Sequence, residues 1–259
     1  MNLHSSWFST LNVLEYFFWF KSTLHFFASV GAVPLGGNTV FFKKNCLQKI
    51  KGWDETCLTE DADIGIRLSN AGAKIRVVYD EEYVTREETP PNLTSFVKQR
   101  TRWNQGFIQI LHKGDWIRFP KLSQKLLAGY ILLLPELQSL LFLFVPISIF
   151  MAFTVKLPVI VTLLSNIPFF ILLLQLIIQT VGLYEFTKDY NLKFSWWMPL
   201  KVFLTFFPYQ IILSLSAFRA IFRTLLGNIA WEKTLHINAH RQHAPASMFP
   251  KVQTNNLSY

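Results

Sequence analysis

Cysteine is almost absent from this sequence of 259 residues, because only Cys46 and Cys57 occur. Both lie in the polar half of the chain, and their number and spacing predict neither a disulfide framework nor a zinc site. No internal repeat and no low-complexity tract is found. No secretory signal is expected either, since the first 35 residues mix charges and histidines with aromatic residues, as an amphipathic surface helix does.

Charged residues are scarce after residue 125, where long uncharged runs begin. Hydrophobic residues make up 51% of the chain and 25 residues are phenylalanine, which is more than an ordinary soluble domain contains. We therefore expect a polar cytosolic part followed by a membrane part. A soluble domain with an unusually large core is the alternative, but such a core does not require uncharged helices of this length.

Blocks of like charge are also missing, although the formal net charge is +9. A basic balance is typical of nucleic-acid binding or of loops at the cytoplasmic face of a membrane. Because the basic residues flank the apolar runs and form no block, the pattern favours the membrane, with no nucleic acid as partner.

Three apolar segments fill the second half of the chain, at residues 126–150, 157–184 and 202–218. A spanning helix needs about 20 apolar residues, a length that the second segment exceeds and the third only approaches. Basic residues before the first segment place that side in the cytosol. Together with the three apolar segments, this predicts a multi-pass protein of the cell (plasma) membrane. The number of spans stays open because the tail is basic too. Glu136 interrupts the first segment and is either functional or interfacial.

The polar half alternates patterns of helices and of short strands. Residues 11–27 and 93–111 have helical periodicity, and Thr59 can cap a helix that ends near Gly72. Residues 39–42 and 75–79 predict short strands, the second from its β-branched residues.

Thr59, Glu60 and Asp61 stand at the predicted start of one helix. The positive end of the helix macrodipole favours a carboxylate, so an acid in the first turn can accept a proton. Simple N-terminal capping is the alternative, since acids are common at that place. Asp61 and Glu60 are therefore candidate catalytic residues.

Gln99 shares one helix face with Arg102 and Trp103, three and four residues further along. A guanidinium binds a diphosphate through two parallel hydrogen bonds, and an indole offers a flat face to a sugar ring. An amphipathic helix anchored at lipid headgroups is the alternative, and the two roles are compatible.

Gly36, Gly37 and Asn38 form a turn signal, and the two glycines permit a close approach of the backbone to a ligand. Alone, this signal also fits a plain turn. The motifs follow one another as Gly36-Gly37-Asn38, Gly52-Trp53-Asp54, Thr59-Glu60-Asp61 and Gln99-x-x-Arg102-Trp103. In this order the chain resembles processive-type family 2 glycosyltransferases, such as cellulose synthase and hyaluronan synthase. The stretch from Trp231 to His236 is similar to the ending of bacterial membrane members of that group.

The resemblance implies an inverting hexosyltransferase that moves a sugar from a nucleotide-sugar donor to a growing polysaccharide or lipid acceptor. It implies that Asp61, with Glu60 beside it, is the base that deprotonates the acceptor hydroxyl. The donor diphosphate and the acceptor end would be bound by Gln99, Arg102 and Trp103, and the acceptor loop would comprise Gly36, Gly37 and Asn38. A divalent metal ion, Mg or Mn, is expected, with its ligands outside this chain.

The resemblance also implies a nucleotide-binding half, which would precede this region in the family. We therefore expect a fragment, or a chain whose donor-binding half comes from another polypeptide, and its activity alone is open. A non-catalytic membrane subunit that associates with a polysaccharide synthase is the alternative. A transporter would need more spans and paired intramembrane charges.

The expected fold is an α/β, partial GT-A-like catalytic region followed by α-helical transmembrane segments. The cytoplasmic catalytic region, with interfacial helices, would occupy residues 1–120. The transmembrane region would occupy residues 121–226, and a polar basic tail residues 227–259.

Overall fold

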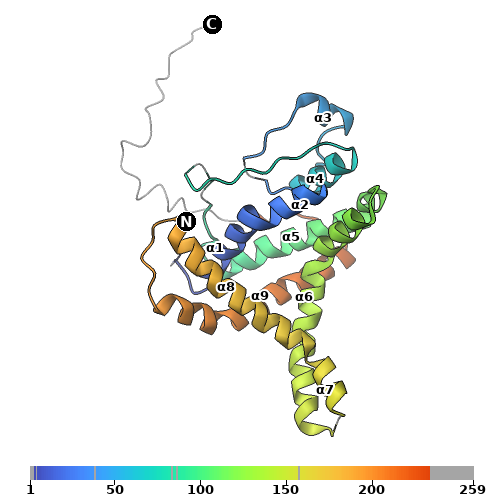
Figure 1. Cartoon of the computed structure of the whole chain (residues 1–259). Coiled ribbons are helices and arrows are strands. Elements are labelled where there is room, and N and C mark those ends of the chain that lie inside the picture. Colours follow the sequence, from blue (N-terminus) through green and yellow to red (C-terminus); the bar gives the residue numbers. More distant parts are fainter. Residues whose placement is uncertain are drawn as a thin grey trace.

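Helices make up the regular structure of the chain, in a computed structural model that describes residues 3, 5–37, 39–82, 84–85, 87–156 and 158–233 (Figure 1). They follow one another as α1 (Ser9–Phe18), the π-helical turn η1 (Trp19–Thr23), α2 (Leu24–Val30), α3 (Lys44–Lys49), α4 (Glu60–Asn70), α5 (Leu93–Lys113), the 3₁₀ turn η2 (Asp115–Arg118), α6 (Leu122–Thr154), α7 (Val159–Ser165), α8 (Ile167–Asp189) and α9 (Trp197–Leu225). The polar helices α3 and α4 lie at one end of the molecule, and the tip formed by α6 and α7 lies at the other (Figure 1).

The expected α/β, GT-A-like region is wrong for this chain, because no strand occurs among the described residues. Residues 75–79 are extended and alternate as a strand would, with Ile75, Val77 and Tyr79 half-buried and the residues between them exposed. A strand also needs a neighbour that pairs with its N–H and C=O groups. The backbones of residues 39–42 and 74–79 make no such bond to another described residue. The period-two pattern is therefore present without a sheet.

The helices expected in the polar half are confirmed, with longer boundaries. The first runs from Ser9 to Val30 through α1, η1 and α2, and it ends at Gly31, whose φ of 81° suits a residue without a side chain. Helix α5 contains the expected segment 93–111. Helix α4 begins after Thr59 as expected, but the Thr59 side chain makes no capping hydrogen bond.

Two hydrophobic cores hold the helices together, and α5 takes part in both. The first core joins α1, α5, α8 and α9, and in it the ring of Phe96 lies 4.9 Å from that of Phe8 and 5.5 Å from that of Tyr209. The second core joins α2, α4, the end of α5 and the start of α6, and it includes Ile64 and Ile110. The position of α5 therefore depends on both halves of the molecule.

A partly buried ion pair connects α1, α5 and α9. The guanidinium of Arg100 on α5 contacts the carboxylate of Glu15 on α1, and the hydroxyl of Tyr209 on α9 donates a hydrogen bond to the same carboxylate. Burial disfavours the charge on Arg100, but the Glu15 carboxylate, together with Tyr209 and Tyr16, outweighs burial and raises the pKa of Arg100 above its ordinary value. The pair fixes α5 against both neighbouring helices.

Among the described residues of the apolar half, two helices, α8 and α9, are long and apolar enough to cross a membrane by length and composition. A shorter apolar stretch, Leu143–Thr154, forms the second part of α6. The third predicted segment, residues 202–218, was too short, because α9 continues through Lys201 and Arg219 to 29 residues. Many apolar side chains of these helices are exposed, as on Phe153 of α6 and Ile177 of α8.

We expect Arg100→Met to lower the free energy of unfolding by about 1–3 kcal/mol, because it leaves the partly buried Glu15 carboxylate without its charged partner. Denaturation in detergent micelles measures the loss. Adding Glu15→Gln should restore part of it, since both charges are then gone. Arg118→Met is the control: Arg118 pairs with Asp115 at the surface, so the change should stay below about 1 kcal/mol. If the loss of unfolding free energy in the double variant equals the sum of the losses in the two single variants, Arg100 and Glu15 are not coupled.

Candidate functional site

The first turn of α4 brings two carboxylates to the edge of the polar region. Glu60 and Asp61 are the first residues of the helix, and one carboxylate oxygen of Asp61 accepts a hydrogen bond of 2.8 Å from the backbone N–H of Ala62. The chain at Gly37 passes directly opposite, since a Cβ there would lie 3.0 Å from Asp61 Oδ2. The predicted loop and the predicted base are therefore in contact, at a place where the missing side chain leaves room.

The other two residues of the predicted acceptor loop are placed differently. Gly36 faces the rings of Phe20 and Trp19 instead of the carboxylates, with a Cβ position 3.3 Å from Phe20. Asn38 lies outside the described residues. Gly37 is thus the described loop residue that the structure brings to Asp61.

An open cleft of about 340 Å³ lies beside the two carboxylates. Its walls combine Glu60 and Asp61 with Leu35, Gly37, residues 39–42 and Trp53. Aromatic side chains form much of the lining, because Phe41 is 91% exposed and Phe42 packs edge-to-face on Trp53 at 5.4 Å. The volume falls in the range of small-molecule sites, and flat aromatic faces suit sugar rings.

The environment of Asp61 changes its acidity. Burial raises the pKa of the Asp61 carboxyl, and the negative charge of Glu60 acts in the same direction, while the N–H of Ala62 and the charge of Arg102 oppose the shift. A carboxylate with a raised pKa holds a proton more firmly than an ordinary one. This is the change that a general base requires.

Arg102 reaches the same region from α5. Its Nη1 donates a hydrogen bond of 3.3 Å to the carbonyl of Leu58, just before the two acids. Burial lowers the pKa of Arg102, and the charges of Glu60 and Asp61 oppose that shift, so the three groups are electrostatically coupled. The Nε of Arg102 is buried without a partner among the described residues.

Gln99 and Trp103 lie away from the cleft lining, although they share the helix with Arg102. Gln99 is buried, and its side-chain oxygen has no partner among the described residues. Trp103 packs edge-to-face on Tyr16 at 6.0 Å, and the guanidinium of Arg100 lies 4.7 Å from its ring centre. The structure therefore brings Arg102 to the acids but does not bring the indole of Trp103 to the described cleft.

One face of α5 carries three further residues that the motif analysis missed: Gly106, Gln109 and Lys113. With Arg102 they are spaced by four, three and four residues, so they form a row along one helix face. This spacing is a signal in the sequence, but it becomes meaningful only when the segment facing it is known. Each member of the row contacts the segment from residue 54 to residue 63.

The contacts of this row are close. A Cβ at Gly106 would lie 2.3 Å from Thr59 Oγ1, so any side chain there forces the helix away. The Gln109 side chain accepts a hydrogen bond of 2.9 Å from the N–H of Leu58 and donates one of 3.3 Å to the carbonyl of Thr56. Lys113 lies 2.6 Å from Asp54 and 2.8 Å from Asp63.

The segment after α9 returns to α5. The ring of Trp231 lies 4.3 Å from the guanidinium carbon of Arg102, and Glu232 accepts two hydrogen bonds of 2.6 Å from Arg219. Gln105 donates a hydrogen bond of 2.6 Å to the carbonyl of Asn228. The first described part of the tail is thus held against the helix that carries Arg102, and residues 234–259 lie outside the described part of the chain.

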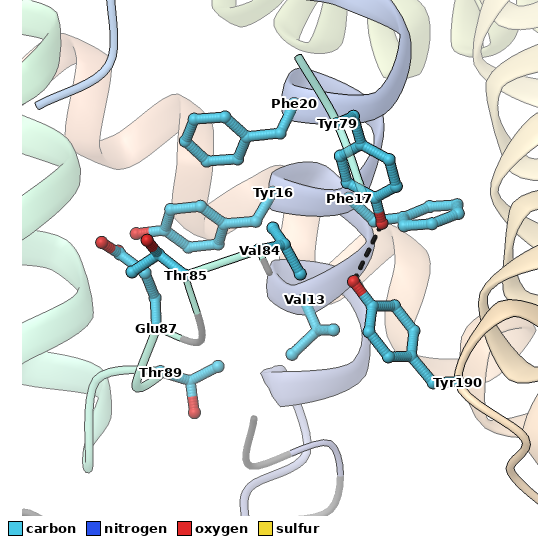
Figure 2. A pocket seen from close by; sticks show the side chains of 10 residues that line it. All are labelled: Val13, Tyr16, Phe17, Phe20, Tyr79, Val84, Thr85, Glu87, Thr89 and Tyr190. Carbon is cyan, nitrogen blue, oxygen red and sulfur yellow. Dashed lines mark hydrogen bonds between the residues drawn. The ribbon is translucent and has the colours of Figure 1, made fainter. Parts of the chain in front are cut away.

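A second cavity lies between α1 and the segment from residue 79 to residue 89 (Figure 2). Its volume of about 20 Å³ has room for roughly one water molecule, so it does not fit a sugar. Figure 2 shows Tyr16 directed toward Thr85 and Glu87, and shows the hydrogen bond of 2.9 Å between the hydroxyls of Tyr79 and Tyr190. The cavity is therefore a small gap where α1, residues 79–89 and Tyr190 after α8 pack together.

The described residues do not fit a divalent metal ion. No group of three or more His, Cys, Asp or Glu residues lies close enough together among them, and Glu60 and Asp61 have Arg102 as their charged neighbour.

Known proteins support a function in sugar transfer. The family model described as "Glycosyl transferase family group 2" matches residues 1–231. A probable glycosyltransferase, YdaM of Bacillus subtilis, is 31% identical over 88 residues, which cover 34% of this chain and 18% of that protein. A poly-beta-1,6-N-acetyl-D-glucosamine synthase of Staphylococcus epidermidis is 28% identical over 116 residues, which cover 44% of this chain and 27% of that protein.

A probable glycosyltransferase of Sulfolobus acidocaldarius is 35% identical over 78 residues, which cover 30% of this chain and 16% of that protein. The matched part of the chain thus spans less than a third of the length of each of these relatives. No solved structure matches. Because the family model covers most of the sequence, including both the α4 acids and the face of α5 that meets them, the chain belongs to the family 2 glycosyltransferases.

Proposed function

We propose that this chain carries the base and the acceptor side of an inverting, processive-type hexosyltransferase embedded in the cell membrane. The observation that carries the proposal is the Asp61 carboxylate, which lines an open cleft while burial raises its proton affinity. Glu60 supports that shift through its charge. The aromatic walls of the cleft offer packing surfaces for the rings of a polysaccharide or glycolipid acceptor.

In the proposed reaction, Asp61 accepts the proton of an acceptor hydroxyl while the hydroxyl oxygen attacks the anomeric carbon of a nucleotide sugar. The bond between that carbon and the diphosphate oxygen breaks on the opposite side, so the configuration at the carbon inverts. Gly37 leaves room for the acceptor next to the carboxylate, because any side chain there would crowd Asp61 Oδ2.

The leaving diphosphate is assigned to Arg102, whose planar guanidinium can form two parallel hydrogen bonds to phosphate oxygens. Its unpartnered Nε supports this role, since a buried donor without a partner is costly unless a ligand satisfies it. Gln99 and Trp103 are assigned to the same donor and acceptor ends, with their side chains re-oriented on binding. A divalent metal ion at the diphosphate would be held by groups other than the described residues, supplied by a separate chain or a further region.

The membrane part of the proposal rests on α8, which would cross the bilayer together with α6. Helix α9 would lie along the cytoplasmic face of the membrane, because its middle packs on α5 and the segment that follows it contacts Gln105 and Arg102. The connection between α8 and α9 carries Lys193 and the exposed Trp196, which stacks on the exposed Trp197 at the start of α9, as is typical of a membrane–water interface. The hydrogen bond between Tyr79 and Tyr190 ties this connection to the polar region. The connection and the site are therefore assigned to the same, cytoplasmic side.

We expect Asp61→Asn to reduce sugar transfer by about a hundred- to ten-thousand-fold, because an amide cannot accept the proton of the attacking hydroxyl at neutral pH. Membranes of the source cells, with the variant in place of the native gene, keep any partner chain present. Transfer is measured as incorporation of radiolabel from UDP-N-acetylglucosamine. The Staphylococcus epidermidis relative, named for a poly-N-acetylglucosamine, suggests this donor. UDP-glucose is the second donor to be tested.

Glu55→Gln is the matched control, because Glu55 is an exposed acid six residues before Asp61 that lies outside the cleft lining. It should leave transfer unchanged. Near-normal transfer by Asp61→Asn, with the protein folded, would instead favour the non-catalytic subunit.

The raised pKa of Asp61 predicts a second, independent effect on stability. A carboxyl whose folded pKa exceeds its unfolded pKa contributes stability below the unfolded value of about 4, and this contribution is lost as pH rises through the folded pKa. Asp61→Asn should therefore raise the Tm in detergent at pH 7 and bring no gain at pH 4 or below. A lower Tm at pH 7 would show that the ionised carboxylate stabilises the fold.

The membrane topology predicts that the chain resists extraction by carbonate at high pH and keeps Cys46 in the cytosol. In a Cys57→Ser background, Cys46 is the remaining thiol and is partly exposed. An impermeant maleimide should label it in permeabilised cells and leave it unlabelled in intact cells. Labelling of Cys46 in intact cells would show that the orientation is the opposite one. Release of the protein from the membrane by carbonate would show that it is not an integral membrane protein.

A further inference from the structure

We propose that Gln109 is the positioning residue that holds Asp61 at a fixed place relative to Arg102. The inference rests on the proposed function, because it concerns how the base of that reaction is kept in place. It starts from the row of residues on α5 formed by Arg102, Gly106, Gln109 and Lys113. This row faces the turn before α4, residues 54–59, which has no regular structure of its own beyond turns.

Gln109 bonds to the backbone of this turn on both sides of Cys57. Its Oε1 accepts from the N–H of Leu58 at 2.9 Å, and its Nε2 donates to the carbonyl of Thr56 at 3.3 Å. An amide is a side chain that can satisfy a donor and an acceptor at once. Both bonds are to backbone atoms, so they fix the path of the turn whatever its side chains do.

The neighbours of Gln109 on the row set the distance and the direction. Gly106 lets α5 touch Thr59, the residue directly before Glu60. Lys113 binds Asp63, which is 1% exposed and lies in the first turns of α4, and also binds Asp54 at the start of the segment. Arg102 bonds to the carbonyl of Leu58, whose N–H is held by Gln109. The turn is thus held along its length, and Gln109 supplies its two central backbone bonds.

The consequence is that the base and the diphosphate-binding group share one support. Asp61 follows Leu58 by three residues, and Arg102 is bonded to Leu58 itself. If the Gln109 amide is removed, the turn between Asp54 and Thr59 loses its central support, while the ion pairs of Lys113 remain. The carboxylate of Asp61 then samples a wider range of positions, although it stays on a folded helix.

Cys57 reports on this turn directly, because it is 3% exposed and sits between the two residues that Gln109 binds. In a Cys46→Ser background it is the remaining thiol. We expect Gln109→Ala to increase the rate of Cys57 labelling by N-ethylmaleimide about tenfold, the effect of two lost hydrogen bonds. Gln109→Glu keeps the acceptor for Leu58 and loses the donor to Thr56, so its rate should be intermediate. Asn104→Ala, on another face of α5, is the control and should not change the rate.

Transfer by the same variants tests the positioning role. We expect Gln109→Ala to lower kcat about tenfold or more with little change in the KM for the nucleotide sugar, and Gln109→Glu to recover part of kcat. Native-like labelling of Cys57 in Gln109→Ala overturns the inference, and so does faster labelling with native kcat. If membranes with the native chain transfer no sugar, the proposed function fails, while labelling still decides whether Gln109 holds the turn.

Discussion

The contact between Arg100 and Glu15 is the constraint on which the rest of the structure depends. It joins the first helix to α5, and the hydroxyl of Tyr209 adds the last helix to the same carboxylate. Helix α5 is therefore fixed by groups at both ends of the sequence, and no local signal determines its position. A partly buried charge pair of this kind gives little net stability, but it penalises any arrangement in which one partner is alone.

The candidate site follows from this fixed helix. From Arg102 onward, the side chains of one face of α5 meet the segment before α4, and they hold it by hydrogen bonds to its backbone, a close glycine contact and an ion pair. Asp61 is thus placed by a rigid element that also carries Arg102. Functional groups on such supports keep their geometry better than groups on free loops, and a base that must meet one hydroxyl requires that.

Much of the candidate site was predictable from the sequence, because its motifs are local. The acids follow a helix start, and Arg102 lies on a periodic helix, so Asp61 and Arg102 could be named and the structure brings them together. The row formed by Gly106, Gln109 and Lys113 was missed, because its meaning depends on which segment faces α5. The strands were wrong for a similar reason: alternation at residues 75–79 is local, whereas pairing requires a neighbour that the described residues do not supply.

The extended segment from residue 74 to residue 79 has a practical consequence for handling the protein. Its backbone N–H and C=O groups make no hydrogen bond to the backbone of another described residue, and such a row is a surface on which extended segments of other molecules can align. Lys74 and Arg76 point outward from it and repel a second copy of the same segment, as charged side chains do on exposed edges of soluble proteins. Salt screens this repulsion, so the protection that these two charges give to the segment weakens as the ionic strength rises.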